Sequence, residues 1–165
     1  MISIGGNFVA DSNAEIKLVK KAKVSQNRRK SRELVLKAVY RGMINASELK
    51  QIIADAKEDP EYIKADENYF KHLLEGVTGR VTELDSQISV YIDRKLEELS
   101  PVEHAILRIS SFELMFDMSI PYRVAINEGV ELAKLYGGID GHKYINGVLD
   151  KVAASARSTE FGKKN

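Results

Sequence analysis

The stretch FKHLLEGVTGRVTELDSQISVY, residues 70–91, has the most regular hydrophobic pattern in this chain and decides its fold class. Its apolar side chains alternate in steps of four and three residues, at Phe70, Leu74, Val77, Val81, Leu84, Ile88 and Tyr91. This spacing continues for three heptads without a proline and predicts one amphipathic helix with a continuous buried seam. Gly76 and Gly79 allow close packing or a bend. A lone coiled coil would cover such a seam, but other amphipathic segments are present, so we expect an intramolecular helical bundle.

A strong helix-start signal follows this stretch. Ser100 suits the N-cap, Pro101 suits the first helical position, and Glu103 can complete a capping box. We expect this helix to continue to about Met118, with apolar residues on two of its faces. A helix that is apolar on two faces lies between neighbouring helices, so we predict that it is the central element of the core.

Other start and stop signals divide the rest of the chain. Residues 46–57 have the pattern of a short helix, and Pro121 opens a helix that ends at Gly137. The Asp140 side chain is predicted to cap a last helix. No segment has a convincing strand pattern. The sequence therefore predicts an all-α protein, with a helical domain over residues 27–157 and a frayed tail over residues 158–165.

Basic residues are concentrated near the N-terminus. Residues 17–32 contain eight lysines and arginines and no acidic residue, which leaves 17 basic residues against 24 acidic ones in the rest of the chain. A basic arm on an acidic body is typical of a protein that binds phosphates locally. Residues 1–26 show no sustained helical period, so we expect them to form a flexible basic extension.

The basic run passes into an amphipathic helix at NRRKSRELVLKAVY, residues 27–40. At about 100° per residue, four basic residues share the face opposite the apolar stripe: Arg29, Lys30, Lys37 and Arg41. Tyr40 lies on the border between the two faces, where an aromatic ring beside cations suits stacking on an unpaired RNA base. A solvated basic face and a partly buried tyrosine would give the same pattern, so both interpretations remain open here.

Several classes of function lack their usual motifs. The chain has no cysteine, and it has no Walker loop, GxGxxG, GxSxG or HExxH motif. Its three histidines have no ligand spacing, and capping explains Asp140 better than a metal corner with His142 does. We therefore expect no enzyme activity, no catalytic residue, no metal and no cofactor. There is no apolar run of membrane-spanning length and no secretory signal, so we expect a cytoplasmic protein without a membrane partner.

Longer motifs resemble those of the bacterial NusB family of transcription antitermination factors. The resemblance covers about residues 28–156, with the motifs in the family's order. They are RRKSRE (28–33) leading to AVY (38–40), LEELSPVE (96–103) continuing into AILRI (105–109) and FEL (112–114), PYRVAINE (121–128), ELAK (131–134) and HKYINGVLDK (142–151).

The resemblance implies two three-helix bundles packed together. It also implies binding to the boxA element of nascent ribosomal RNA leader transcripts, as a heterodimer with NusE, which is the small-subunit ribosomal protein S ten. This pair would help to assemble an antitermination complex on RNA polymerase with NusA and NusG.

The resemblance also implies particular site residues. The residues that match the RNA-binding surface of the family are Arg28, Arg29, Lys30, Arg32, Tyr40, Asp140, Lys143 and Tyr144. The acidic residues that match the family's NusE contact are Glu97 and Glu103, for which surface charge and a capping box are the alternatives. Because Asp140 is anionic, the resemblance implies that it limits RNA affinity, although a helix cap explains it equally well.

Two alternatives remain from the sequence. A similar helical fold occurs as an accessory domain of some RNA methyltransferases, but this chain lacks the catalytic cysteine and the room for a methyl-donor domain. A purely structural protein that forms a homodimer and hides its basic face is the second alternative.

Overall fold

The computed structural model describes residues 4–161, all of whose secondary structure is helical, which confirms the all-α prediction. The α-helices are α1 (Ile4–Ile44), α2 (Leu49–Glu58), α3 (Glu67–Thr78), α4 (Val81–Tyr91), α5 (Pro101–Phe116), α6 (Tyr122–Tyr136), α7 (Gly141–Ala156) and α8 (Ser158–Phe161). Two short 3₁₀ helices, η1 (Tyr62–Lys64) and η2 (Leu96–Glu98), lie between them. No described helix is both long and apolar enough to cross a membrane.

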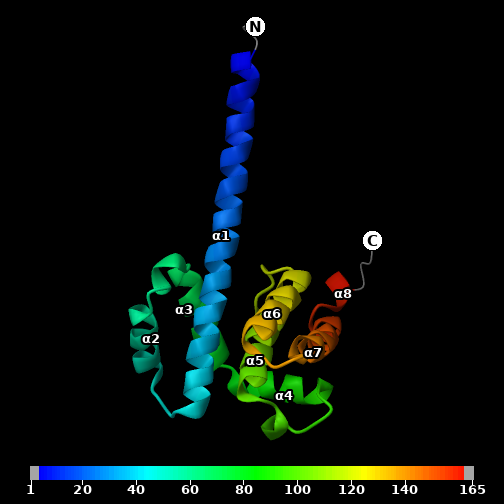
Figure 1. Cartoon of the computed structure of the whole chain (residues 1–165). Helices are drawn as coiled ribbons and strands as arrows, with labels where there is room; N and C mark the ends of the chain where they lie inside the picture. The colour runs from blue at the N-terminus through cyan, green and yellow to red at the C-terminus, as the bar shows by residue number, and fades with distance from the viewer. Residues whose placement is uncertain (1–3, 162–165) are drawn as a thin grey trace.

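The helices form two packed bundles (Figure 1). The first contains α1, α2 and α3, and the second contains α5, α6 and α7, with α4 packed against α5 and α7. Helix α5 also contacts α1 and α3, so it joins the two bundles, as its two apolar faces predict. One hydrophobic core therefore runs through both bundles.

The predicted start of α5 is confirmed. The Ser100 hydroxyl accepts a hydrogen bond from the backbone N–H of Glu103 at 3.1 Å, and Pro101 occupies the first helical position. The cap supplies an acceptor to a backbone donor that the first turn leaves without a partner. The helix ends at Phe116, slightly before the predicted end.

The prediction of one continuous helix over residues 70–91 is wrong. Helix α3 ends at Thr78, and α4 starts at Val81 in a new direction (Figure 1). Most of the predicted seam is nevertheless buried on α3 and α4. Gly79 is the C-cap of α3, and the guanidinium of the next residue, Arg80, lies 4.1 Å from the centre of the Phe116 ring. The two glycines thus permit a bend, and contacts with α5 favour it over a straight helix.

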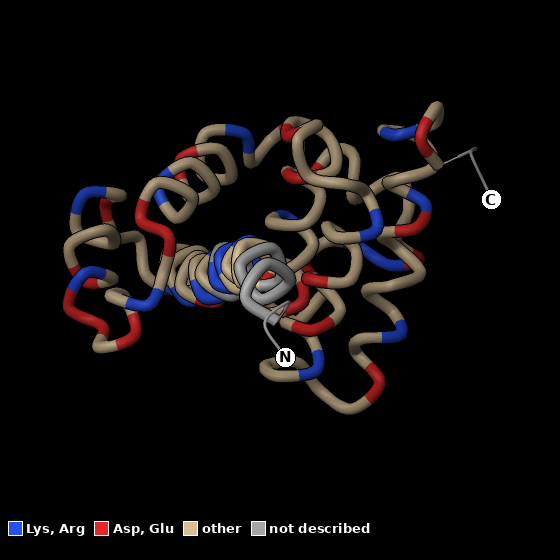
Figure 2. The backbone as a smooth tube through the Cα atoms, turned by 90° about the horizontal axis from the view of Figure 1, so that it is seen from above, with Lys and Arg blue, Asp and Glu red and all other residues tan. Residues whose placement is uncertain are grey.

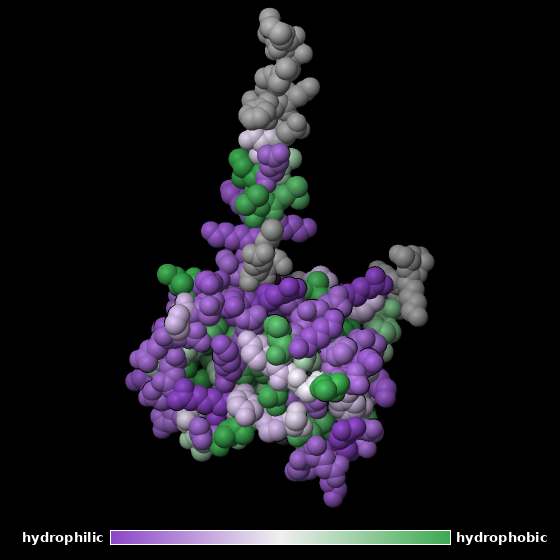
Figure 3. Space-filling model, in the orientation of Figure 1, coloured by the Kyte–Doolittle hydropathy of each residue, from purple (hydrophilic) through white to green (hydrophobic). Residues whose placement is uncertain are grey.

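Helix α1 begins much earlier than the sequence predicts. It starts at Ile4, and its first part stands out from the bundles, with hydrophobic side chains at Ile16, Leu18 and Val19 exposed (Figures 1 and 3). Contacts with the body begin near Asn27, whose carbonyl accepts a hydrogen bond from the backbone N–H of Asp66 at 3.2 Å. The predicted domain start at residue 27 therefore marks where α1 joins the body, and the mobility of the extension stays a prediction.

The expectation of a frayed tail is wrong for residues 158–161, which form α8. The guanidinium of Arg157, just before α8, is buried and donates hydrogen bonds to the carbonyls of Glu113 and Ile120 at 3.0 and 2.8 Å. The ring of Phe161 packs against that of Tyr122, 5.2 Å between centres. Residues 162–165 lie outside the described part of the chain.

Candidate nucleic-acid interface

The basic residues at the point where α1 enters the body do not share one environment. Arg29 donates two hydrogen bonds to the carboxylate of Glu128 on α6, at 3.1 and 3.0 Å, and this partner raises the pKa of Arg29. The Lys30 ammonium lies 2.8 Å from Glu33 and 3.4 Å from Glu61. Both bases therefore face intramolecular carboxylates, although half of the Arg29 side chain remains exposed.

Arg32 is a core residue, which contradicts its predicted place on the RNA-binding surface. It is 3% exposed, and its guanidinium makes a bidentate ion pair with Glu113 of α5, which is fully buried. The Tyr69 hydroxyl also donates to Glu113. Although burial opposes it, the charge of Glu113 raises the pKa of Arg32. Removing an ion from such a pair leaves an uncompensated buried charge, so Arg32 holds the two bundles together and is out of reach of RNA.

Arg28 differs from its three basic neighbours because it has no acidic partner among the described residues. Its guanidinium carbon lies 4.7 Å from the centre of the Tyr69 ring, at cation–π distance. Its Nε atom is buried and has no hydrogen-bond acceptor. Of the four basic residues near residue 30 that are predicted to bind RNA, Arg28 is the one without an ion pair to a described carboxylate.

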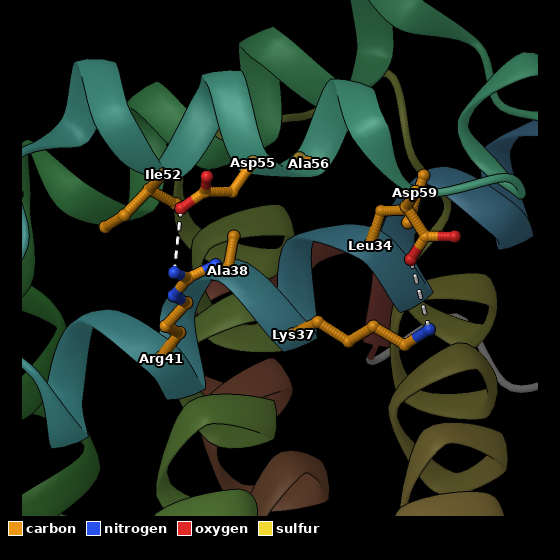
Figure 4. Close-up of a pocket in the computed structure, with 8 residues that line it drawn as sticks. All are labelled: Leu34, Lys37, Ala38, Arg41, Ile52, Asp55, Ala56 and Asp59. Atoms are coloured by element: carbon orange, nitrogen blue, oxygen red, sulfur yellow. Dashed lines mark ion pairs between the residues drawn. The ribbon is translucent and has the colours of Figure 1, made fainter.

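The predicted basic face of α1 continues beside α2, where it is also matched by acids. Figure 4 shows the ion pairs of Arg41 with Asp55, at 2.8 Å, and of Lys37 with Asp59, at 3.5 Å. Viewed along α1, acidic residues lie on segments on both sides of the helix (Figure 2). Tyr40 is 40% exposed, on the border of the buried stripe as the pattern predicts.

The start of α7 presents the other predicted RNA-binding residues, and here the expected cap is absent. Asp140 has a left-handed backbone, with φ of 63° and ψ of 2°, and its side chain makes no capping hydrogen bond. Its carboxylate lies instead 3.3 Å from the ammonium of the exposed Lys143. Asp is one of the few residues other than glycine that adopts this conformation readily. The prediction that the Asp140 side chain caps α7 is therefore wrong, which leaves the carboxylate exposed.

Tyr144, one turn into α7, is half-buried. Its hydroxyl donates to Asp93 at 3.2 Å, and burial together with this bond raises the pKa of Tyr144. The guanidinium of Arg94 lies 4.4 Å from the centre of the ring. Asp93 and Arg94 come from the segment before η2 and were not in the predicted site, because nothing in their local sequence places them beside α7. Aromatic rings and guanidinium planes are also the groups on which splayed RNA bases stack.

The two acidic residues assigned to a protein partner lie close to this group. Glu97, in η2, is exposed. Glu103 is half-buried in the first turn of α5, and its carboxylate lies against Gly141, where an added Cβ would come within 2.7 Å. The structure thus brings Glu103, Asp140 and Tyr144 to one end of the second bundle, whereas Arg28 and Tyr40 lie on α1, across α5 from α7 (Figure 1).

Two of the three histidines lie in pairs with carboxylates. The imidazole of His72 lies 3.1 Å from Asp117, and that of His104 lies 2.8 Å from Asp85, which also binds Arg108. Among residues 4–161 no group of three or more histidine and acidic side chains could hold a metal ion.

Comparisons with known proteins agree with this architecture. The model of the NusB family matches residues 29–154. The transcription antitermination protein NusB of Methylobacillus flagellatus is 58% identical over 139 residues, which are 84% of this chain and 90% of that protein. Its counterpart in Thiobacillus denitrificans is 48% identical over 82% of this chain and 93% of its own length.

Solved structures show the same fold. T. maritima NusB is 30% identical, with a TM-score of 0.72 over 82% of this chain and 96% of that chain. A crystal structure of the antitermination factors NusB and NusE in complex with double-stranded RNA contains a chain with a TM-score of 0.71 at 24% identity, over 78% of this chain and 97% of that one. The family model covers most of the chain, and the relatives match along nearly their whole length, so the chain belongs to the NusB family.

Proposed function

We propose that this protein is a transcription antitermination factor that binds the boxA element of nascent ribosomal RNA leader transcripts in the cytoplasm. It acts as a heterodimer with NusE, and the pair nucleates a complex with NusA and NusG on RNA polymerase. The observation that carries this proposal is the 58% identity to a transcription antitermination protein over 84% of the chain. The likeness in fold to the chain crystallised with NusE and RNA supports the choice of partners.

The side-chain geometry favours the start of α7 as the place where bases are read. Tyr144 offers an aromatic ring, Arg94 stacks on that ring, and Lys143 is exposed beside them. An unpaired base can replace or extend the Arg94–Tyr144 stack, because stacking on aromatic and guanidinium planes is the usual way to hold splayed RNA bases. Tyr40 and Arg28 on α1 would contact the RNA further along its length.

The surface for NusE would lie beside this site. Glu97 and Glu103 would face NusE, and their negative charge would repel RNA from that side of the bundle. A partner that covers these carboxylates removes the repulsion, so NusE binding and RNA binding strengthen each other.

Fluorescence anisotropy of labelled boxA RNA tests the proposal. The RNA is titrated with the protein alone and with NusE, against a scrambled RNA of equal length and at several salt concentrations. We expect tighter binding to boxA and a further gain with NusE. Equal binding to both RNAs in the presence of NusE would refute the assignment.

Two substitutions locate the site. Tyr144→Ala should weaken boxA binding about five- to hundredfold, since stacking contributes roughly 1–3 kcal/mol per base. Tyr122→Ala is the matched control, because Tyr122 is also half-buried but lies at the opposite end of the second bundle, beside α8. Equal losses in both variants would mean that the effect comes from lost stability.

Light scattering with and without RNA would show whether a homodimer competes with RNA for the same face.

A further inference from the structure

The first part of α1 carries a group of lysines without partners. Lys17, Lys20, Lys21 and Lys23 are exposed and make no ion pair with any residue that the structure describes. The basic residues further along α1 contrast with them, because body carboxylates pair with Arg29, Lys30, Arg32, Lys37 and Arg41. Most of the unneutralised positive charge of α1 therefore lies on the part that stands out from the body in Figure 1.

Helical geometry places two of these lysines in one stripe with Arg28. At about 100° per residue, Lys17, Lys21 and Arg28 fall within roughly 40° of one another around the helix axis. The rise of about 1.5 Å per residue spreads them over roughly 16 Å. They would thus face a single ligand that runs along the helix.

The stripe ends in a pocket where α1 meets the loop before α6. Lys21, Arg28 and Ser119 are among the residues that line it. Glu128 also lines it, but two hydrogen bonds from Arg29 occupy that carboxylate. The Nε atom of Arg28 is buried and donates to no described residue, so this guanidinium has a donor that the protein itself does not satisfy.

We propose that Lys17, Lys21 and Arg28 form a phosphate-binding track for RNA, which adds sequence-independent affinity to the site at the start of α7. This inference rests on the proposed function for the identity of the ligand. The family model begins at residue 29, so Lys17 and Lys21 extend the track into a part of this chain that the model does not match, whereas Arg28 is already among the residues that the family resemblance assigns to RNA.

A second copy of the chain is the competing occupant, because Leu18 and Val19 are exposed on the same part of the helix. Paired extensions would bring the lysines of two chains together, and like charges repel. RNA neutralises them and releases its own counterions, so the charge of the extension favours RNA.

The test compares two triple variants of the full-length protein with the same change in net charge. Lys17→Gln/Lys21→Gln/Arg28→Gln removes the track, and Lys50→Gln/Lys57→Gln/Lys71→Gln removes three cations from α2 and α3. Binding to boxA and to scrambled RNA is measured by anisotropy from 50 to 300 mM salt. Circular dichroism checks that both variants keep their helix content.

Each phosphate contact contributes about 0.7 to the slope of log K against log salt for single-stranded RNA. We expect the track variant to lose about two units of slope on both RNAs, and the control variant to lose much less. Equal slopes in the two variants would overturn the track. Conversion of a dimer to a monomer by the track variant, with no change in slope, would also overturn it in favour of a second copy.

The outcomes separate the two proposals. If the unmodified protein does not prefer boxA, the proposed function fails, while a change in slope on both RNAs still supports the track. If boxA preference is present and the slope does not change, the track fails and the proposed function stands.

Discussion

Replacing Arg32 by methionine separates the structural from the RNA-binding role of the basic stretch. The substitution keeps the length of the side chain and removes its charge. Glu113 then remains fully buried, after losing Nε and Nη2 donors that lie 2.8–3.1 Å from its oxygens. The Tyr69 hydroxyl is still a donor but carries no positive charge.

The expected loss follows from the burial of both partners. Breaking a buried ion pair on one side costs about 3–5 kcal/mol, because the remaining charge is uncompensated. For a domain of this size each kcal/mol lowers Tm by roughly 2–4 °C, so the fall in Tm should be about 6–20 °C. Urea unfolding followed by circular dichroism at 222 nm measures the loss directly.

Two further variants make the result decisive. Arg32→Met/Tyr69→Phe/Glu113→Leu removes the whole polar group and should recover most of the lost stability, since apolar replacement of a buried pair is often neutral. Arg28→Met removes a base four residues earlier, where only a cation–π contact of about 0.5–2 kcal/mol is lost. A loss below about 1 kcal/mol in Arg32→Met, with a larger drop in RNA affinity than in Arg28→Met, would refute a structural role for Arg32.

Three other predictions follow from the structure. Asp140→Asn should keep the left-handed turn and release Lys143 from its ion pair. The Kd for RNA, measured by titration at low salt, should therefore fall several-fold. The control is Asp150→Asn, on the exposed side of α7, which should change the Kd little. Asp85 is held by Arg108 and His104, and although its burial opposes ionisation, these hydrogen bonds lower its pKa to about 2 from the usual 3.8. The carboxylate therefore contributes about 2–3 kcal/mol that is present above pH 3.8 and disappears as pH falls towards 2, and Asp85→Asn should flatten unfolding free energy measured over that range. Gly76→Ala should cost about 1–3 kcal/mol in urea unfolding, because its Cβ would overlap the Phe112 ring; an unchanged unfolding free energy would contradict this packing.

The ends of several helices could be predicted because their signals are local. The Ser100 hydroxyl accepts a hydrogen bond from the backbone N–H of Glu103, only three residues later, so the cap can be recognised from a short stretch of sequence. The break between α3 and α4 was harder to predict. The heptad pattern of residues 70–91 describes which side chains are buried, and it holds in both helices. It contains no information on direction, which the contacts of Arg80 and Gly76 with α5 determine.

The ion pairs of α1 could not be predicted from its own sequence, since the partners are distant. Glu128 is 99 residues from Arg29, and Glu113 is 81 residues from Arg32. One signal was nevertheless present. Arg32 precedes Leu36 by four residues and therefore lies on the inner stripe of the helix rather than among the outward-facing bases. A basic side chain on the buried face of a helix needs a carboxylate partner, because an unpaired buried charge is costly. Glu113 is a carboxylate within the apolar sequence of α5.

These ion pairs affect how readily each basic residue of α1 could contact RNA. Arg28 has an unused donor and loses no carboxylate when it binds a phosphate. Arg29 must exchange Glu128 for a phosphate; its own side chain is half exposed, but Glu128 is buried, so this exchange costs more than breaking a fully exposed pair. Arg32 would have to abandon a fully buried partner, which costs more than a phosphate contact returns. A count of charges along residues 28–32 gives these three arginines equal weight, whereas their surroundings differ: the first has no ion pair with a described carboxylate, the second has a half-exposed side chain in an ion pair, and the third lies in the core.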